Sequence, residues 1–97
     1  MKWAAVIEYV PDLEKVAEYR PAHRVYLTRL IENGQLVVAG PFLDDFGALI
    51  VYETADAGAA EVLLKADPFH AAGVFAKWII RPWKTVFGNP ALLPPHG

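Results

Sequence analysis

His23 is the first candidate in this sequence for acid–base chemistry. It lies in the segment YRPAHRVYLTRLIENG, two residues after Pro21. Proline lacks a backbone N–H and suits the first position of a helix, so the segment predicts a helix over residues 21–33 with His23 in its first turn. The positive end of the helix dipole disfavours the protonated ring at that place. A neutral imidazole is a competent general base, although a half-buried histidine with one ordinary hydrogen bond explains the same pattern.

Asp67 is the second candidate, because a carboxylate can orient a histidine and stabilise its protonated form. It precedes Pro68 in the segment DPFHAAG. An aspartate before a proline usually caps backbone N–H groups in a turn, which is the alternative explanation. Separation along the sequence does not decide between these roles. In the fold expected below, both helices cover the same face of a sheet, which allows Asp67 to meet His23.

A metal site is a further alternative, since His70 stands close to Asp67 in the sequence. No spaced histidine or cysteine cluster of the zinc type accompanies these residues, so we expect no metal. His96 belongs to the C-terminal tail and is expected at the surface.

Arg20 and Arg24 flank the predicted helix start. Solvation explains both, and their functional interpretation is to anchor an anionic group of a substrate. Gly40 and Pro41 follow a predicted strand and most simply form a turn. The sequence holds no glycine-rich phosphate loop and no nucleophile elbow, so we expect no nucleotide cofactor and no serine hydrolase chemistry.

Apolar runs bounded by glycine, proline and aspartate predict the elements that must position these residues. The predicted strands cover residues 2–10, 35–40, 48–53 and 74–83. The predicted helices cover residues 13–19, a short piece, then 21–33 and 56–66, and Gly34 is expected as a left-handed cap. Residues 67–73 are predicted to be a loop, because Pro68 disfavours a helical Asp67. The proline-rich residues 88–97 are predicted to be an extended tail.

The resulting order β-α-β-β-α-β predicts an α+β fold of the ferredoxin-like type, with both helices on one face of a four-stranded antiparallel sheet. The other face of such a sheet normally meets water, and its strands then alternate apolar and polar residues. The segments LVVA and LIVY are apolar on both faces, and VFAKWII is nearly so. We therefore expect a homodimer whose sheets face each other in a barrel-like core.

Composition narrows the classes of partner. The chain has 97 residues, which suits one domain, and 55% of them are hydrophobic, which favours an apolar surface in contact with a partner. The formal net charge is −2 and no basic patch stands out, so nucleic acids and anionic membranes are not expected partners. There is no cysteine, which excludes disulfides and thiol catalysis. No apolar run approaches the roughly 20 residues of a spanning helix, and no signal-peptide pattern is present, so we expect a cytoplasmic protein.

Three stretches taken in order resemble the YCII-related, or YciI-like, family: RPAH at 20–23, GQLVVAGP at 34–41 and DPFHAAGVF at 67–75. The closing IRPWKTVF at 80–87 fits as well, so the resemblance defines a domain over residues 1–87. It implies a dimeric α+β barrel similar in fold to muconolactone isomerase. It also implies a histidine–aspartate pair in a pocket, which falls on His23 and Asp67, and some members of the family remove chloride from a hydroxylated ring. Ala48 stands where some members carry a hydroxyl residue, and no role is carried onto His70.

These observations together predict a small dimeric enzyme without a cofactor that moves a proton on a compact cyclic or unsaturated, anionic metabolite. His23 would be the general base or acid, and Asp67 would orient it. The residues expected to shape or charge the pocket are Arg20, Gly40, Pro41 and Phe69, the last as an apolar wall. Isomerisation, lactone chemistry and elimination, including dehydrochlorination, all begin with such a proton transfer.

Two other classes fit the same sequence. The first is a non-catalytic dimeric module for ligand binding or an accessory role, in which His23 and Asp67 form a structural pair. The second is a cofactor-free barrel of the monooxygenase type, since one fold supports several chemistries.

Overall fold

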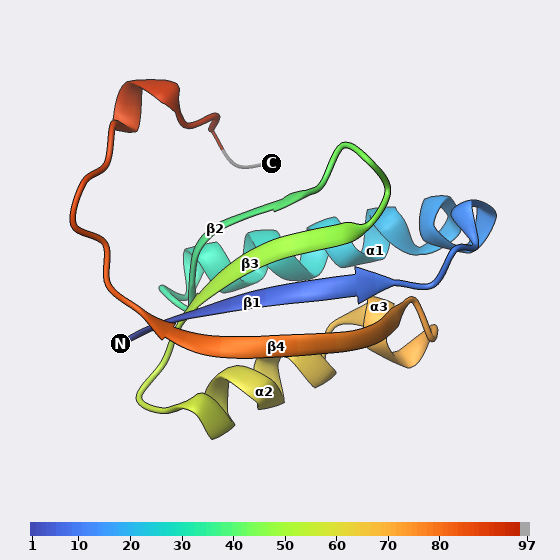
Figure 1. Cartoon of the computed structure of the whole chain (residues 1–97), viewed down its shortest axis with the longest axis horizontal. Coiled ribbons are helices and arrows are strands. Elements are labelled where there is room, and N and C mark those ends of the chain that lie inside the picture. The colour runs from blue at the N-terminus through green and yellow to red at the C-terminus, as the bar shows by residue number, and fades with distance from the viewer. Residues whose placement is uncertain (96–97) are drawn as a thin grey trace.

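The computed structural model describes residues 1–95, which form one four-stranded antiparallel sheet with helices packed against it (Figure 1). The strands are β1 (Lys2–Tyr9), β2 (Leu36–Pro41), β3 (Gly47–Glu53) and β4 (Phe75–Trp83). Their order across the sheet is β2-β3-β1-β4, so β1 lies in the interior and β2 and β4 lie at the edges. The expected α+β fold with β-α-β-β-α-β order is thereby confirmed. His96 and the last position of the predicted tail lie outside the described residues.

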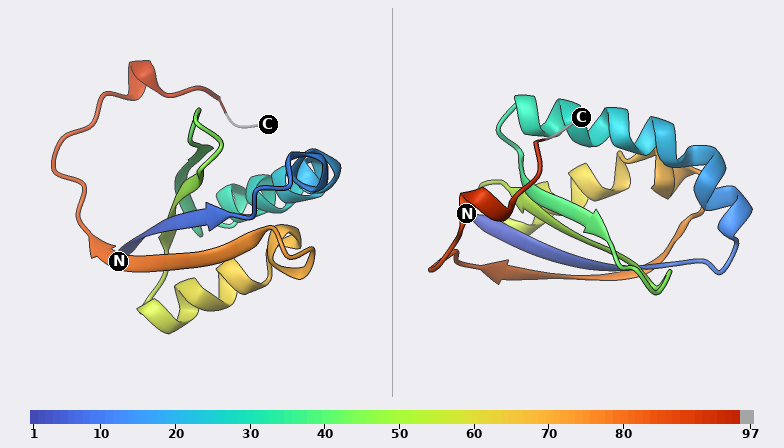
Figure 2. Two further views of the ribbon diagram at one scale, coloured as in Figure 1. Left: turned by 45° about the vertical axis from the view of Figure 1, so that its right-hand side comes forward. Right: turned by 90° about the horizontal axis from the view of Figure 1, so that it is seen from above.

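The helices α1 (Leu13–Glu32), α2 (Ala57–Lys65) and α3 (Pro68–Ala71) lie on one side of the sheet (Figure 2). The side chains of the strands that face them alternate with those that face away. The buried core between sheet and helices contains Ala5, Ile7, Ile50 and Tyr52 from the strands, and Val16, Leu30, Ala60 and Leu64 from the helices.

Helix α1 is a single helix that begins at Leu13, so the predicted start at Pro21 is wrong. The Asp12 side chain caps it by accepting a hydrogen bond from the N–H of Lys15 at 3.1 Å. Pro21 then lies inside the helix and leaves the carbonyl of Ala17 without its usual donor. Both residues are exposed, so water can supply the missing hydrogen bond. His23 therefore lies in the middle of α1, and the argument from the helix dipole does not apply to it.

Residues 67–73 contain a short helix, α3, and the prediction of a loop there is wrong. Pro68 takes the first helical position, where its missing N–H costs nothing. Asp67 precedes it in an extended conformation, with φ −66° and ψ 135°, as a residue before proline prefers. Asp67 thus begins α3 as its N-cap.

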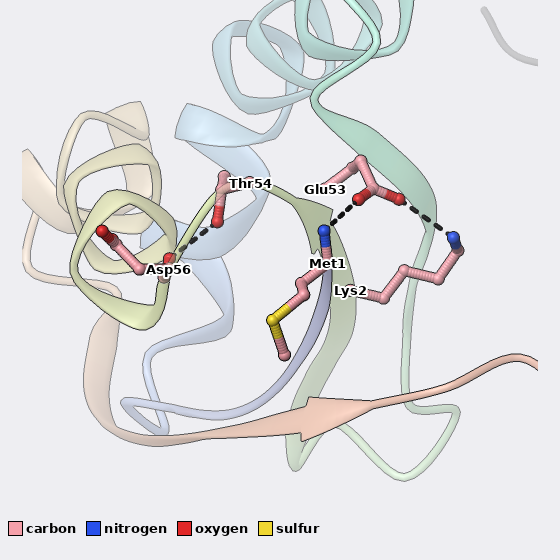
Figure 3. A network of polar contacts seen from close by, with 5 residues as sticks. All are labelled: Met1, Lys2, Glu53, Thr54 and Asp56. Atoms are coloured by element: carbon pink, nitrogen blue, oxygen red, sulfur yellow. Dashed lines mark hydrogen bonds and ion pairs between the residues drawn. The ribbon is translucent and has the colours of Figure 1, made fainter.

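Helix α2 agrees with its prediction, and Asp56 caps it by accepting from the N–H of Ala59 at 2.8 Å. A network of polar contacts lies near the start of α2, at the end of β3 (Figure 3). The Glu53 carboxylate accepts hydrogen bonds from the amino group of Met1 at 2.6 Å and from Lys2 Nζ at 2.9 Å. These hydrogen bonds hold the pKa of Glu53 below its usual value. They also fasten the start of β1 to the end of β3.

The face of the sheet opposite the helices is partly apolar and open in the single chain. Leu49, Val6 and Ile79 lie side by side across β3, β1 and β4, and their exposed fractions are 36%, 43% and 63%. Val51 lies on the same face and is buried. The apolar character that the sequence shows on both faces is therefore present on this open face.

Two further features complete the fold. Gly34 has φ +72° and closes the end of α1, as predicted. After β4 the chain runs outward from the sheet as a tail, which contains one turn of 3-10 helix at Pro90–Leu92 (Figure 1). Within residues 1–95, no helix is both long enough and apolar enough to span a membrane.

Candidate active site

His23 and Asp67 lie in direct contact, although they come from different elements. Nδ1 of His23 on α1 is 2.8 Å from Oδ1 and 2.8 Å from Oδ2 of Asp67, which precedes α3. Asp67 is fully buried and His23 is 7% exposed. Both helices pack on the same face of the sheet, which is how the fold joins residues 44 positions apart.

The carboxylate fixes which nitrogen of His23 carries the proton when the ring is neutral. Nδ1 faces two carboxylate oxygens, which only accept hydrogen bonds, so Nδ1 is the donor. The lone pair then lies on Nε2. Nε2 has no hydrogen-bond partner within residues 1–95, and it is not one of the fully enclosed polar atoms. The His23 side chain is 9% exposed, and Nε2 is its atom with a free lone pair that can accept a proton.

Asp67 combines the two roles that the sequence left as alternatives. Its Oδ1 accepts a hydrogen bond from the N–H of Phe69 at 2.9 Å, which caps α3. The same carboxylate binds His23 Nδ1. Held from both sides and shielded from water, the carboxylate has one orientation, and it imposes that orientation on the imidazole.

Aromatic rings surround the imidazole. The Phe69 ring stacks on His23 with centroids 4.1 Å apart and an angle of 13° between the planes. Phe75 meets the imidazole with its edge at 6.5 Å. Tyr9 packs its edge on Phe69 at 5.4 Å and stacks on Phe75 at 6.0 Å. Phe69 thus covers one face of the His23 ring, and its part as the apolar wall of a pocket stays a prediction.

Tyr9 and Phe75 are members of this cluster that the sequence analysis did not single out. The available signal was periodicity: Tyr9 continues the alternate positions of β1 that face the helices. Burial, and secondly the negative charge of Asp67, raise the pKa of Tyr9 to about 12, while Arg20 acts in the opposite direction. Tyr9 is consequently a neutral phenol at physiological pH.

Arg20 lies one turn before His23 on α1 and is exposed. Gly40 and Pro41 lie at the end of edge strand β2, where they pair with Leu49 and Ala48. No hydrogen bond within residues 1–95 joins Gly40 or Pro41 to the histidine–aspartate pair, so their part in a pocket stays a prediction.

Tyr52 is a buried phenol close to the site. Its hydroxyl has no hydrogen-bond partner within the described chain, and the same holds for Nε1 of Trp3, the residue opposite it on β1. Burial raises the pKa of Tyr52, and the charge of Asp67 adds to this effect. By contrast, the hydroxyl of Tyr26 donates to the carbonyl of Leu63 at 2.6 Å.

His70 takes no part in the pair. Its ring lies edge-on against Trp78 at 5.6 Å. Among residues 1–95, no three or more histidine, cysteine, aspartate or glutamate side chains gather in an arrangement that could hold a metal ion.

The family model described as the YCII-related domain matches residues 1–84. Protein YciI of Escherichia coli is 35% identical over 86 residues, covering 78% of this chain and 88% of that protein. An uncharacterised protein of Haemophilus influenzae is 32% identical over 98 residues, which cover 90% of this chain and 100% of that protein.

A solved structure shares the fold. It is 5-chloro-2-hydroxyhydroquinone dehydrochlorinase (TftG) from Burkholderia phenoliruptrix, in complex with 2,5-dihydroxybenzoquinone. The TM-score is 0.76 and the sequence identity is 28%, over 87% of this chain and 94% of the other.

Proposed function

The chain belongs to the YCII-related domain family, and we propose that it is a small acid–base enzyme in which His23 moves a proton on a compact oxygenated ring. One observation carries the proposal. His23 binds the buried Asp67 through Nδ1 at 2.8 Å and leaves the lone pair of Nε2 without a hydrogen-bond partner within residues 1–95. This is the arrangement of an oriented general base.

The proposed chemistry needs no group beyond the pair for the proton transfer itself. Nε2 takes a proton from the substrate, and the imidazolium that forms is stabilised by the Asp67 carboxylate. In an elimination, the electron pair released by the substrate forms a new double bond, and the leaving group departs with the electrons of its own bond. The imidazolium then returns its proton to solvent. General acid–base catalysis of this kind contributes about 10²- to 10⁴-fold in rate.

The surroundings of Nε2 support a ring-shaped, oxygen-bearing substrate. Phe69, Phe75 and Tyr9 supply flat apolar surfaces beside His23. Arg20 supplies a positive charge whose influence extends to Tyr9. The dehydrochlorinase of the same fold acts on a chlorinated hydroxyhydroquinone and holds a dihydroxybenzoquinone. Elimination of chloride from a hydroxylated ring is therefore the first reaction to assay.

The test measures chloride release from 5-chloro-2-hydroxyhydroquinone by the purified protein and by two variants, His23→Gln and Asp67→Asn. We expect both variants to lose at least about 10²-fold in kcat/KM while remaining folded by circular dichroism. His70→Gln is the matched control, because it changes a histidine that packs on Trp78 outside the pair. Full turnover by His23→Gln would remove the proposal. A His23→Gln variant that loses stability but no turnover would favour the non-catalytic module, with the pair in a structural role.

We also propose that two copies associate through the open faces of their sheets. The row of Leu49, Val6 and Ile79 supports this, because its exposed apolar surface is contiguous across three strands. Light scattering at micromolar concentration is expected to give the mass of a dimer, and Ile79→Lys is expected to give a monomer. A clean monomer for the unaltered protein would contradict the proposal.

A further inference from the structure

Tyr9 ends β1 at a local irregularity of the sheet. The pairing of β1 with β4 shifts its register between Glu8 and Tyr9. Such bulges re-aim a side chain of the bulged strand, and they recur beside active sites. Here the unpaired residue is Ala76 of β4, so the bulge turns Phe75 toward the helices. Tyr9 keeps the alternation of β1 and packs on both Phe69 and Phe75, the two rings that contact His23.

The hydroxyl of Tyr9 has no use within the fold. It makes no hydrogen bond within residues 1–95, and it is not fully enclosed. Tyr26 provides the contrast, because its hydroxyl is already bound to the carbonyl of Leu63. A phenol with a largely desolvated ring and an unoccupied hydroxyl is available to a ligand that enters beside His23.

Two charges of the site act on this hydroxyl in opposite directions. Asp67, from the pair, disfavours the phenolate, and Arg20, on the exposed side of α1, favours it. The hydroxyl therefore lies within range of both the buried carboxylate and the cation at the surface. Because the phenol stays protonated at neutral pH, it serves as a hydrogen-bond donor and not as a base.

We propose that the Tyr9 hydroxyl donates a hydrogen bond to an oxygen atom of the ring substrate while His23 transfers the proton. This inference rests on the proposed function and names a second residue that touches the substrate. As negative charge develops on that oxygen, the hydrogen bond strengthens, so the hydroxyl stabilises the transition state more than the bound substrate. It also selects rings that carry an oxygen over rings that do not.

The experiment compares Tyr9→Phe with Tyr26→Phe. Each variant removes one hydroxyl and keeps the ring, and Tyr26→Phe is the control because its hydroxyl is committed to Leu63. Binding of 2,5-dihydroxybenzoquinone is measured by calorimetry, and chloride release from 5-chloro-2-hydroxyhydroquinone is measured in parallel. For Tyr9→Phe we expect about 10-fold weaker binding and about a 10²-fold loss in kcat/KM. For Tyr26→Phe we expect lower stability with unchanged binding and turnover.

Wild-type affinity in Tyr9→Phe, or equal effects of the two variants, overturns the role of Tyr9. If the protein binds the quinone through Tyr9 but releases no chloride, the proposed reaction fails while the role of Tyr9 stands. If the unaltered protein does not bind the quinone at millimolar concentration, the role of Tyr9 falls. Should Tyr9→Phe fail to fold, selective ¹³C labelling of tyrosine in the unaltered protein replaces it. The Tyr9 ring resonance must then move on addition of the quinone, and an unmoved resonance overturns the proposal.

Discussion

Asp67→Asn is expected to move the proton of the neutral His23 ring from Nδ1 to Nε2. In the unaltered protein the Asp67 carboxylate accepts hydrogen bonds from two donors, His23 Nδ1–H at 2.8 Å and the Phe69 N–H at 2.9 Å. Asparagine keeps one acceptor oxygen and replaces the other by an NH₂ group that only donates. The oxygen is expected to remain on the Phe69 N–H, which holds α3, and the NH₂ group then faces Nδ1. Nδ1 is 2.8 Å from both carboxylate oxygens, and the NH₂ group in the place of Oδ2 only donates. We expect this donor to make Nδ1 the acceptor, so that Nε2 carries the proton and loses its function as a base.

The size of the effect follows from the number of hydrogen bonds that change. A hydrogen bond to a charged group contributes about 1.5–3 kcal/mol, and a neutral one about 0.5–1.5 kcal/mol. The hydrogen bonds of Asp67 with His23 and with the Phe69 N–H both change from charged to neutral. We therefore expect a loss of about 2–3 kcal/mol in the free energy of unfolding. In a domain of this size that lowers Tm by about 10–20 °C. The wrong tautomer is expected to cost about 10³- to 10⁴-fold in turnover, by analogy with asparagine at the aspartate of a serine protease triad.

The assay is a long-range ¹H–¹⁵N correlation spectrum of the imidazole, recorded at a pH at which the ring is neutral. The unaltered protein is expected to show a protonated Nδ1, and the variant a protonated Nε2. Urea unfolding gives the stability change of the same samples. A variant that keeps the proton on Nδ1, or that turns over at the wild-type rate, would show that Asp67 does not orient His23. A stability loss alone would assign the pair a structural role.

Three further substitutions test other parts of the structure. In Gly47→Ala the new Cβ would lie 1.8 Å from the carbonyl oxygen of Ile7, so β1 and β3 must separate. We expect a loss of about 3 kcal/mol in the free energy of unfolding, or no folded protein by circular dichroism. A Tm within a few degrees of wild type would contradict this. Tyr52→Phe removes a buried hydroxyl that lacks a partner within residues 1–95 and is expected to stabilise by about 1 kcal/mol in thermal unfolding; a loss of stability would instead reveal a bound water. Glu53→Gln tests the lowered pKa of Glu53. A lowered folded-state pKa adds stability above the usual value of 4.5 that is lost as pH falls through the folded-state pKa. Urea unfolding is therefore expected to show a smaller loss of stability for the variant than for wild type as pH falls below 4.5, and equal losses would refute the assignment.

Two prolines show how far local sequence rules predict this fold. The preference of proline for the first helical position predicts a helix start at Pro21, which is wrong because Asp12 caps the helix two turns earlier. The same preference holds at Pro68, where α3 begins in a segment predicted to be a loop. The residue that precedes each proline explains why one begins a helix and the other does not. Asp67 is extended and caps α3, whereas Arg20 is helical.

The candidate site was predictable in its residues but not in its geometry. The sequence offered His23 and Asp67 as separate candidates, each with an ordinary explanation. Their contact depends on how α1 and α3 dock on the sheet, which no local pattern specifies. Phe75 escaped prediction for a related reason, since its direction toward the helices depends on a register shift between β1 and β4. Such a shift arises from the pairing of distant strands.

The interior position of β1 has a consequence for the order in which the protein can fold. β1 comes first in the sequence, and one of its two partners, β4, comes last among the strands. During synthesis β1 can pair with β3, but its other edge stays unpaired until residues 75–83 have been added. An unpaired, apolar edge is a template for aggregation. Contacts this distant in sequence also slow folding. A chain that ends before β4 therefore leaves β1 as an exposed edge strand, although it already contains both His23 and Asp67.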